Sequence, residues 1–207
     1  MAYTFTLALR GEAWERSSQC RQGHLRQPCL GLVRHYFSIQ HSDLLNILSQ
    51  SSYWSMQYGD GNMTWGPDPA LTERGLLEAG IAAEAWTREL SVDAPLPESW
   101  YSSPLSRSAT TMEITWKGLI PHGKKVMITE KWRETIGLHT CDKRSTKSEI
   151  QKKYPNYDIE EGFTEEDELY TSEGMETQYQ QVYRTWAALD DLFGTDDSTC
   201  TLKKASF

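Results

Sequence analysis

The sequence predicts an α/β fold in which helices pack against a mainly parallel sheet. Segments rich in β-branched and aromatic residues alternate with segments rich in helix formers, a pattern typical of strands joined by helical crossovers. The chain has 207 residues, enough for one domain with a substantial hydrophobic core. The sequence contains no internal repeat. We therefore expect the strands and helices to share one α/β domain.

Strands are predicted at four places. "YTFTLAL" (3–9) is β-branched and aromatic with partial alternation, and "KVMITEKW" (125–132) has a similar character. "GLVRHYFSI" (31–39) is a short apolar run, and the loop "APLPESWYSSP" (94–104) leads into another short strand. The Gly, Asp and Pro residues of "YGDGNMTWGPDP" (58–69) indicate a loop before the first long helix.

Three helices are predicted. "LTERGLLEAGIAAEAWTREL" (71–90) begins at Thr72, a residue type favoured at the N-cap, and "LSRSATTMEITWKGL" (105–119) begins just after a proline. "METQYQQVYRTWAALDDLF" (175–193) is amphipathic and ends at Gly194. For the first helix we expect one apolar face, made of Leu76, Leu77, Gly80, Ile81 and Ala85.

Composition excludes several classes of partner. The net charge of −8 argues against nucleic acid as the main partner. The mean hydropathy is −0.61, and no apolar run reaches the roughly 18 residues of a membrane span, so no membrane partner is expected. The N-terminus lacks the features of a signal peptide, and the four cysteines show neither CxxC spacing nor a histidine at ligand spacing. These features predict a cytoplasmic protein without a zinc site or disulfide framework.

An arginine near a strand end is the first candidate for chemistry. In "YSSPLSRSAT" (101–110), small residues and a proline end a strand, and Arg107 falls in the first turn of the following helix. Helix N-termini attract anions, and an arginine there adds a bidentate donor for phosphate. The alternative interpretation is a surface arginine beside a turn.

A pair of acids forms the second candidate. In "ITEKWRETIG" (128–137), Glu130 and Glu134 flank Arg133 at the end of a predicted strand. A carboxylic acid at the C-terminal end of a strand is well placed for general acid catalysis in an α/β crevice. The alternative interpretation is a solvated cluster of charges.

Three blocks, taken in order, resemble one family. "SYWSMQYGDGNMTWGPDPALTERG" (52–75), "WYSSPLSRSATT" (100–111) and "ITEKWRETIGLHTCDKRS" (128–145) closely resemble the histidine phosphatase superfamily, also called phosphoglycerate mutase-like. The nearest branch is that of the fungal phosphomutase-like acid phosphatases, and the resemblance covers residues 52–195. It implies a three-layer α/β fold and a phosphomonoester phosphatase that acts through a phosphohistidine intermediate.

The resemblance also implies a set of site residues. His35 is the available nucleophile, and Arg34 beside it and Arg107 would bind the phosphate. Glu134 would protonate the leaving oxygen. The family's substrates are small phosphorylated molecules, and its chemistry needs no metal or cofactor.

Two departures from the family pattern bear on activity. The residue after His35 is Tyr36 rather than glycine, and a better strand upstream ends at Arg10-Gly11 with no histidine between them. No histidine follows His139, so the second catalytic histidine is absent, and with it we expect the last central strand to be missing. The alternatives to a phosphatase are therefore an inactive or truncated family member, binding phosphoesters at most, and a mutase that moves phosphate between hydroxyls.

The resemblance divides the chain into parts. Residues 1–51 match poorly, residues 52–195 form the histidine phosphatase-like domain with a polar insertion at 139–172, and residues 196–207 form a tail. The codons possible for residues 33–50 are compatible with splice signals, so a translated intron is one explanation of the poor match. A diverged or decayed paralogue is the other.

Overall fold

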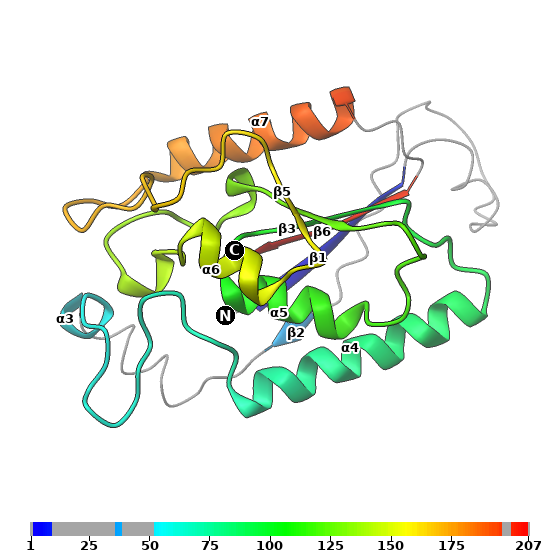
Figure 1. The fold of residues 1–207 in the computed structure, drawn as a ribbon, viewed down its shortest axis with the longest axis horizontal. Helices are drawn as coiled ribbons and strands as arrows, with labels where there is room; N and C mark the ends of the chain where they lie inside the picture. Colours follow the sequence, from blue (N-terminus) through cyan, green and yellow to red (C-terminus); the bar gives the residue numbers. More distant parts are fainter. Residues whose placement is uncertain (1, 10–35, 39–51, 196–199, 207) are drawn as a thin grey trace, which may run out of the picture.

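The computed structural model describes residues 2–9, 36–38, 52–195 and 200–206, and it shows a sheet with helices on both faces (Figure 1). The strands are β1 (Ala2–Leu9), β2 (Tyr36–Ser38), β3 (Ser99–Ser102), β4 (Val126–Ile128), β5 (Asp158–Ile159) and β6 (Cys200–Ser206). The helices and 3-10 turns are α3 (Ser52–Ser55), α4 (Glu73–Ser91), α5 (Ser106–Thr115), η1 (Glu130–Trp132), η2 (Thr140–Asp142), α6 (Lys147–Lys153) and α7 (Gln178–Thr195). The α/β class predicted from the sequence is confirmed.

The strands form one mixed sheet in the order β2-β1-β6-β3-β4-β5. β6, β3, β4 and β5 run parallel to one another, whereas β1 is antiparallel to both β2 and β6. Trp100 of β3 pairs with Val126 on one side and with Leu202 on the other. β3 is therefore central, and its C-terminal end opens onto the same edge of the sheet as those of β4 and β6.

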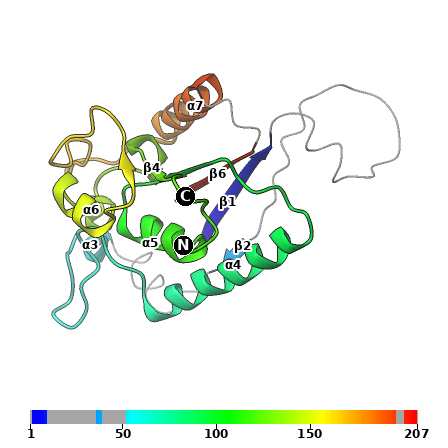
Figure 2. The same cartoon turned by 45° about the vertical axis from the view of Figure 1, so that its right-hand side comes forward.

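β6 corrects the prediction that the last central strand is missing. Its residues Cys200–Ser206 pair along their whole length with β1, and Thr201–Lys204 pair with β3 on the other side (Figure 2). The sequence suggested a polar tail because Lys203 and Lys204 interrupt any apolar run. Hydrogen bonding to two neighbours establishes this strand where side-chain propensity does not.

Neighbouring residues of β3 face different helices. Trp100 packs with Met112 of α5, whereas Tyr101 packs against the cluster of Trp132 and Ala188, the latter in α7. Because successive side chains of a strand point to opposite faces, α5 covers one face of the sheet and α7 the other. Figure 1 shows α4 and α5 together on one side and α7 on the opposite side, which makes three layers.

Packed tryptophan rings join β3 to α4 and to the end of α5. The rings of Trp86 and Trp116 lie 4.8 Å apart between centroids, and those of Trp100 and Trp116 lie 5.9 Å apart. Trp100 and Trp116 are each 1% exposed. Aromatic pairs of this kind add about 1 kcal/mol each beyond the burial of their surface. The packed rings therefore hold β3 against α5, and the turn that joins these two elements is where the candidate site begins.

α4 begins as predicted but buries a different face. Thr72 is its N-cap, with Oγ1 accepting a hydrogen bond from the Gly75 amide at 3.2 Å. Ala79 and Ala82 are buried, whereas Leu77 is 70% exposed. The expected apolar face was thus wrong, because a stripe of small residues lets α4 approach α5 closely. The large apolar side chains of the predicted face that stay exposed are Leu76, Leu77 and Ile81.

The polar insertion at 139–172 folds around one buried arginine. Arg144 donates to Oε1 of Glu130 at 2.5 Å and to the backbone carbonyls of residues 164–166. Its guanidinium also stacks on the ring of Phe163 at 4.1 Å. The insertion is therefore joined to the segment after β4 by a charged hydrogen-bond network. Across the described ranges, no helix has the length and apolar character needed to cross a membrane.

Candidate active site

Arg107 is the central cation of the candidate site. It is the second residue of α5, and its side chain is 4% exposed. Nη1 donates to the backbone carbonyl of Cys141 at 2.9 Å, and Nη2 donates to Oε2 of Glu134 at 2.9 Å. Nε is buried and has no hydrogen-bond partner within the described part of the chain. Burial disfavours the cation, but Glu134 and the other nearby acids outweigh this and raise the pKa of Arg107.

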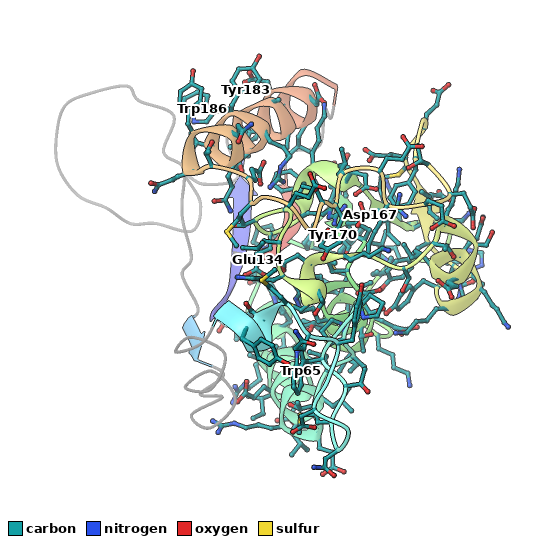
Figure 3. All side chains as sticks on the ribbon, turned by 90° about the vertical axis from the view of Figure 1, so that its left-hand side faces the viewer. Trp65, Glu134, Asp167, Tyr170, Tyr183 and Trp186 are labelled. Carbon is teal, nitrogen blue, oxygen red and sulfur yellow. The ribbon has the colours of Figure 1, made fainter. Side chains whose placement is uncertain are left out.

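Glu134 reaches Arg107 because of the backbone just before it. Arg133 is the C-cap of η1, and its backbone is extended with φ −68° and ψ 153°. Successive side chains of an extended chain point in opposite directions. Arg133 therefore turns to Asp167 of the insertion, donating to its two oxygens at 2.8 Å each, while Glu134 turns to Arg107. In the view of Figure 3, Glu134 lies in the middle of the molecule, between α7 and Trp65.

A second acid lies beside the same arginine. Oδ1 of Asp142 is 3.5 Å from Nη2 of Arg107, and Oδ2 is 3.7 Å from Nδ1 of His139. Burial raises the pKa of Asp142 to about 6; Arg107 opposes this rise and Glu134 adds to it. Asp142 therefore changes charge close to neutral pH, unlike an exposed aspartate. Arg107 faces one or two carboxylates depending on pH.

Cys141 is not a candidate nucleophile. Burial, together with the neighbouring Asp142, raises the pKa of its thiol to about 12. Because the thiolate is the reactive form, this side chain is unreactive at neutral pH. Its contribution to the site is the backbone carbonyl that accepts from Arg107.

The N-terminus of α5 already holds an anionic group. Asp68 accepts hydrogen bonds from the Ser106 amide at 2.6 Å and the Ser106 hydroxyl at 2.8 Å. The Ser145 hydroxyl donates to the same carboxylate at 2.6 Å. This side chain ties the 58–69 loop to the start of α5, whereas phosphate binding at Arg107 stays a prediction. Ser102 and Ser103, at the same turn, are fully buried.

The structure brings together two of the four predicted site residues. Arg107 and Glu134 are in contact, whereas Arg34 and His35 lie outside the described residues, just before β2 begins at Tyr36. Glu130, the other acid of the predicted pair, contacts Arg133 and Arg144 and so belongs to the network beneath the insertion.

Sequence reasoning assigned no role to Asp142 or Asp68, although both stand in the blocks 52–75 and 128–145 that resemble the family. The signal available for Asp142 was its place in "HTCD", eight residues after Glu134. In the described residues, no group of three or more His, Cys, Asp and Glu side chains has the arrangement of a metal site.

Comparison with known proteins identifies the family. The family model described as "Histidine phosphatase superfamily (branch 1)" matches residues 55–200. This match contains both Arg107 and Glu134. The chain belongs to the histidine phosphatase superfamily. The family binds phosphorylated small molecules, and the buried, charged Arg107 is a group suited to that ligand class.

Curated relatives come from fungi. The chain is 42% identical to a "Probable phosphoglycerate mutase" of Arthroderma benhamiae over 150 residues, 71% of this chain and 44% of that protein. It is 36% identical to "Phosphomutase-like protein 3" of Candida albicans over 141 residues, 68% of this chain and 43% of that one. A "Probable phosphoglycerate mutase" of Saccharomyces cerevisiae is 30% identical over 164 residues, 69% of this chain and 54% of that protein. The chain thus spans about half the length of the curated relatives it matches. No solved structure matches it significantly.

Proposed function

We propose that the protein is a phosphomonoester phosphatase that acts through a phosphohistidine intermediate. The observation that carries this proposal is the buried Arg107 guanidinium, whose Nε–H has no partner among the described residues while an acid, Glu134, lies against its Nη2. A phosphate oxygen can accept from Nε and Nη2, which places the ester oxygen close to the acid. Family membership supports the same chemistry.

The proposed reaction has two steps. In the first, His35 attacks phosphorus, the bond from phosphorus to the ester oxygen breaks, and Glu134 gives its proton to the departing oxygen. In the second, water attacks phosphorus, the bond from phosphorus to the His35 nitrogen breaks, Glu134 takes the proton from that water, and inorganic phosphate leaves. Arg107 and Arg34 hold the equatorial oxygens, on which charge is concentrated throughout.

Phosphate binding and proton donation are coupled in this scheme. Nη2 of Arg107 carries two N–H groups and donates one of them to Glu134, so the other can donate to a phosphate oxygen. The phosphate would then lie beside the carboxyl that protonates its ester oxygen.

A second candidate is a phosphoester-binding protein without catalysis. The described residues contain two histidines, His122 and His139, and Nδ1 of His139 lies 3.7 Å from Oδ2 of Asp142. Two relatives are named as probable phosphoglycerate mutases, so the transfer of phosphate between hydroxyls is a further candidate reaction. Both candidates would use the same arginine.

Hydrolysis of p-nitrophenyl phosphate by the full chain tests the proposal. We expect turnover that is lost in His35→Ala and lowered by roughly 100-fold or more in Glu134→Gln. Activity that survives His35→Ala refutes the nucleophile. Absence of turnover, together with calorimetric phosphate binding that Arg107→Met abolishes, would support the binding protein instead. Absence of both would refute both candidates.

A further inference from the structure

Arg184 directs three of its five hydrogen bonds to the segment that carries Glu134. It lies within α7, and its Nε and Nη2 donate to the two oxygens of Glu176 at 2.8 and 2.7 Å. Nη1 donates to the backbone carbonyls of Lys131 at 2.9 Å and Arg133 at 3.0 Å. Nη2 also donates to the carbonyl of Glu134 itself, at 3.0 Å. The five N–H groups of the guanidinium thus have five acceptors.

These carbonyls need such a donor because the segment has little regular structure. η1 is a single 3-10 turn of three residues, and the last carbonyls of a helical turn have no partner within it. Arg184 supplies the missing donors from the far layer of the sheet, since α7 covers the face opposite α5. A fixed, planar guanidinium can hold several carbonyls in one geometry, which a flexible ammonium cannot.

Glu176 fixes the backbone on the other side of Glu134. Its Oε2 accepts from the Ile136 amide at 3.2 Å, and its own amide donates to the Ile136 carbonyl at 2.8 Å. The backbone is therefore fixed on both sides of Glu134, at residue 133 before it and at residue 136 after it. The Arg184–Glu176 pair is only partly exposed, with side chains 15% and 11% accessible. Water competes weakly for these bonds.

We propose that Arg184 is a positioning residue that holds the Glu134 carboxyl at the phosphate-binding arginine. The inference rests on the proposed function, in which Glu134 is the proton donor. Glu134 meets Arg107 with one oxygen only, at 2.9 Å, so the direction of its side chain depends on where its backbone is held. Arg107 is fixed separately, by the Cys141 carbonyl, and Arg184 therefore controls the acid without touching the phosphate.

Steady-state kinetics of the full chain test this role. Arg184→Met keeps much of the side-chain volume and removes every donor; we expect kcat to fall by roughly 10- to 100-fold with KM nearly unchanged. Arg184→Lys should recover part of the loss. In a Glu134→Gln background the second change to Met should lower kcat no further, since the acid is already absent. Additive losses in the double variant, or a rise in KM alone, would refute positioning.

Hydrogen–deuterium exchange tests, independently of activity, whether Arg184 fixes the backbone around Glu134. In Arg184→Met we expect faster exchange over residues 130–138 and unchanged exchange in α5. Equal acceleration in both places would show a global loss of stability and refute the proposal. Arg74→Met is a matched control, because Arg74 is also a helical arginine paired with a glutamate, Glu78, but lies on α4. A wild-type chain that hydrolyses no ester refutes the proposed function. Unchanged exchange over residues 130–138 in Arg184→Met refutes the positioning role of Arg184.

Discussion

Replacing the buried acid Asp142 with asparagine should make the protein more stable as pH rises, relative to wild type. The pKa of Asp142 is raised from 3.8 to about 6, with burial as the main cause. Between these values the native state binds a proton that the unfolded state has lost, so the wild-type free energy of unfolding falls with rising pH. At about 1.4 kcal/mol per pKa unit, the full penalty is about 3 kcal/mol, of which about 2 kcal/mol develops between pH 4 and pH 8.

Urea unfolding at a series of pH values measures this effect. The free energy of unfolding of Asp142→Asn minus that of wild type should grow by about 2 kcal/mol from pH 4 to pH 8 and level off above pH 7. The difference removes the contributions of other titrating groups that the two proteins share. The interactions of Asp142 with Arg107 and Cys141 are already part of its pKa. Effects of the substitution that do not depend on pH add a constant offset, so the slope is the quantity to compare.

Asp158→Asn provides the control. Asp158 is half exposed and pairs in solvent with Lys125 at 2.8 Å, so its replacement should change the free energy of unfolding by about 1 kcal/mol or less. A flat difference for Asp142→Asn would show that burial and Arg107 cancel at this site. A difference that shrinks with pH would show that the attraction of Arg107 outweighs burial, which reverses the reasoning.

Two further substitutions test how the site is anchored. Asp68→Asn replaces one acceptor oxygen with a donor, which would face either the Ser106 amide at Oδ1 or the Ser106 and Ser145 donors at Oδ2, so we expect a loss of about 1–3 kcal/mol in urea unfolding; retention of wild-type stability would contradict the four-bond capping role of Asp68. Thr72→Ala removes the side chain that caps α4 and should lower the free energy of unfolding by about 1 kcal/mol, whereas Thr72→Ser keeps the oxygen and should lose much less. An equal loss in both Thr72 variants would assign the effect to packing of the methyl group.

Local chemistry explains which parts of the fold could be predicted. The start of α4 follows from Thr72, because capping depends on neighbours within a few residues. The buried face of α4 could not be predicted in this way. Ala79 and Ala82 are buried because their small side chains let α5 pack closely, and hydrophobicity alone does not indicate this. β6 was missed for a related reason: both of its partners lie more than 90 residues away in sequence, and nothing in Lys203 or Lys204 announces them.

The candidate site shows the same division. Strand ends made Arg107 and the Glu130–Glu134 pair candidates, because the ends of parallel strands meet at one edge of a sheet, and the resemblance to the family singled out Arg107 and Glu134. Arg184 could not be found in this way. Its contacts with the 131–134 segment span about fifty residues and two layers of the fold, and on its own helix it resembles any solvent-facing arginine. Long-range acceptors of this kind become visible only in three dimensions.

The network around Arg144 makes the insertion inseparable from the rest of the molecule. Pulling residues 164–166 away would strip the carbonyl partners from a buried guanidinium and leave its charge beside Glu130 without them. A segment held in this way gains little from partial opening, so it should melt together with the sheet in one transition. The 139–172 insertion, which looks like an appendage in the sequence, should therefore unfold only when the whole domain unfolds.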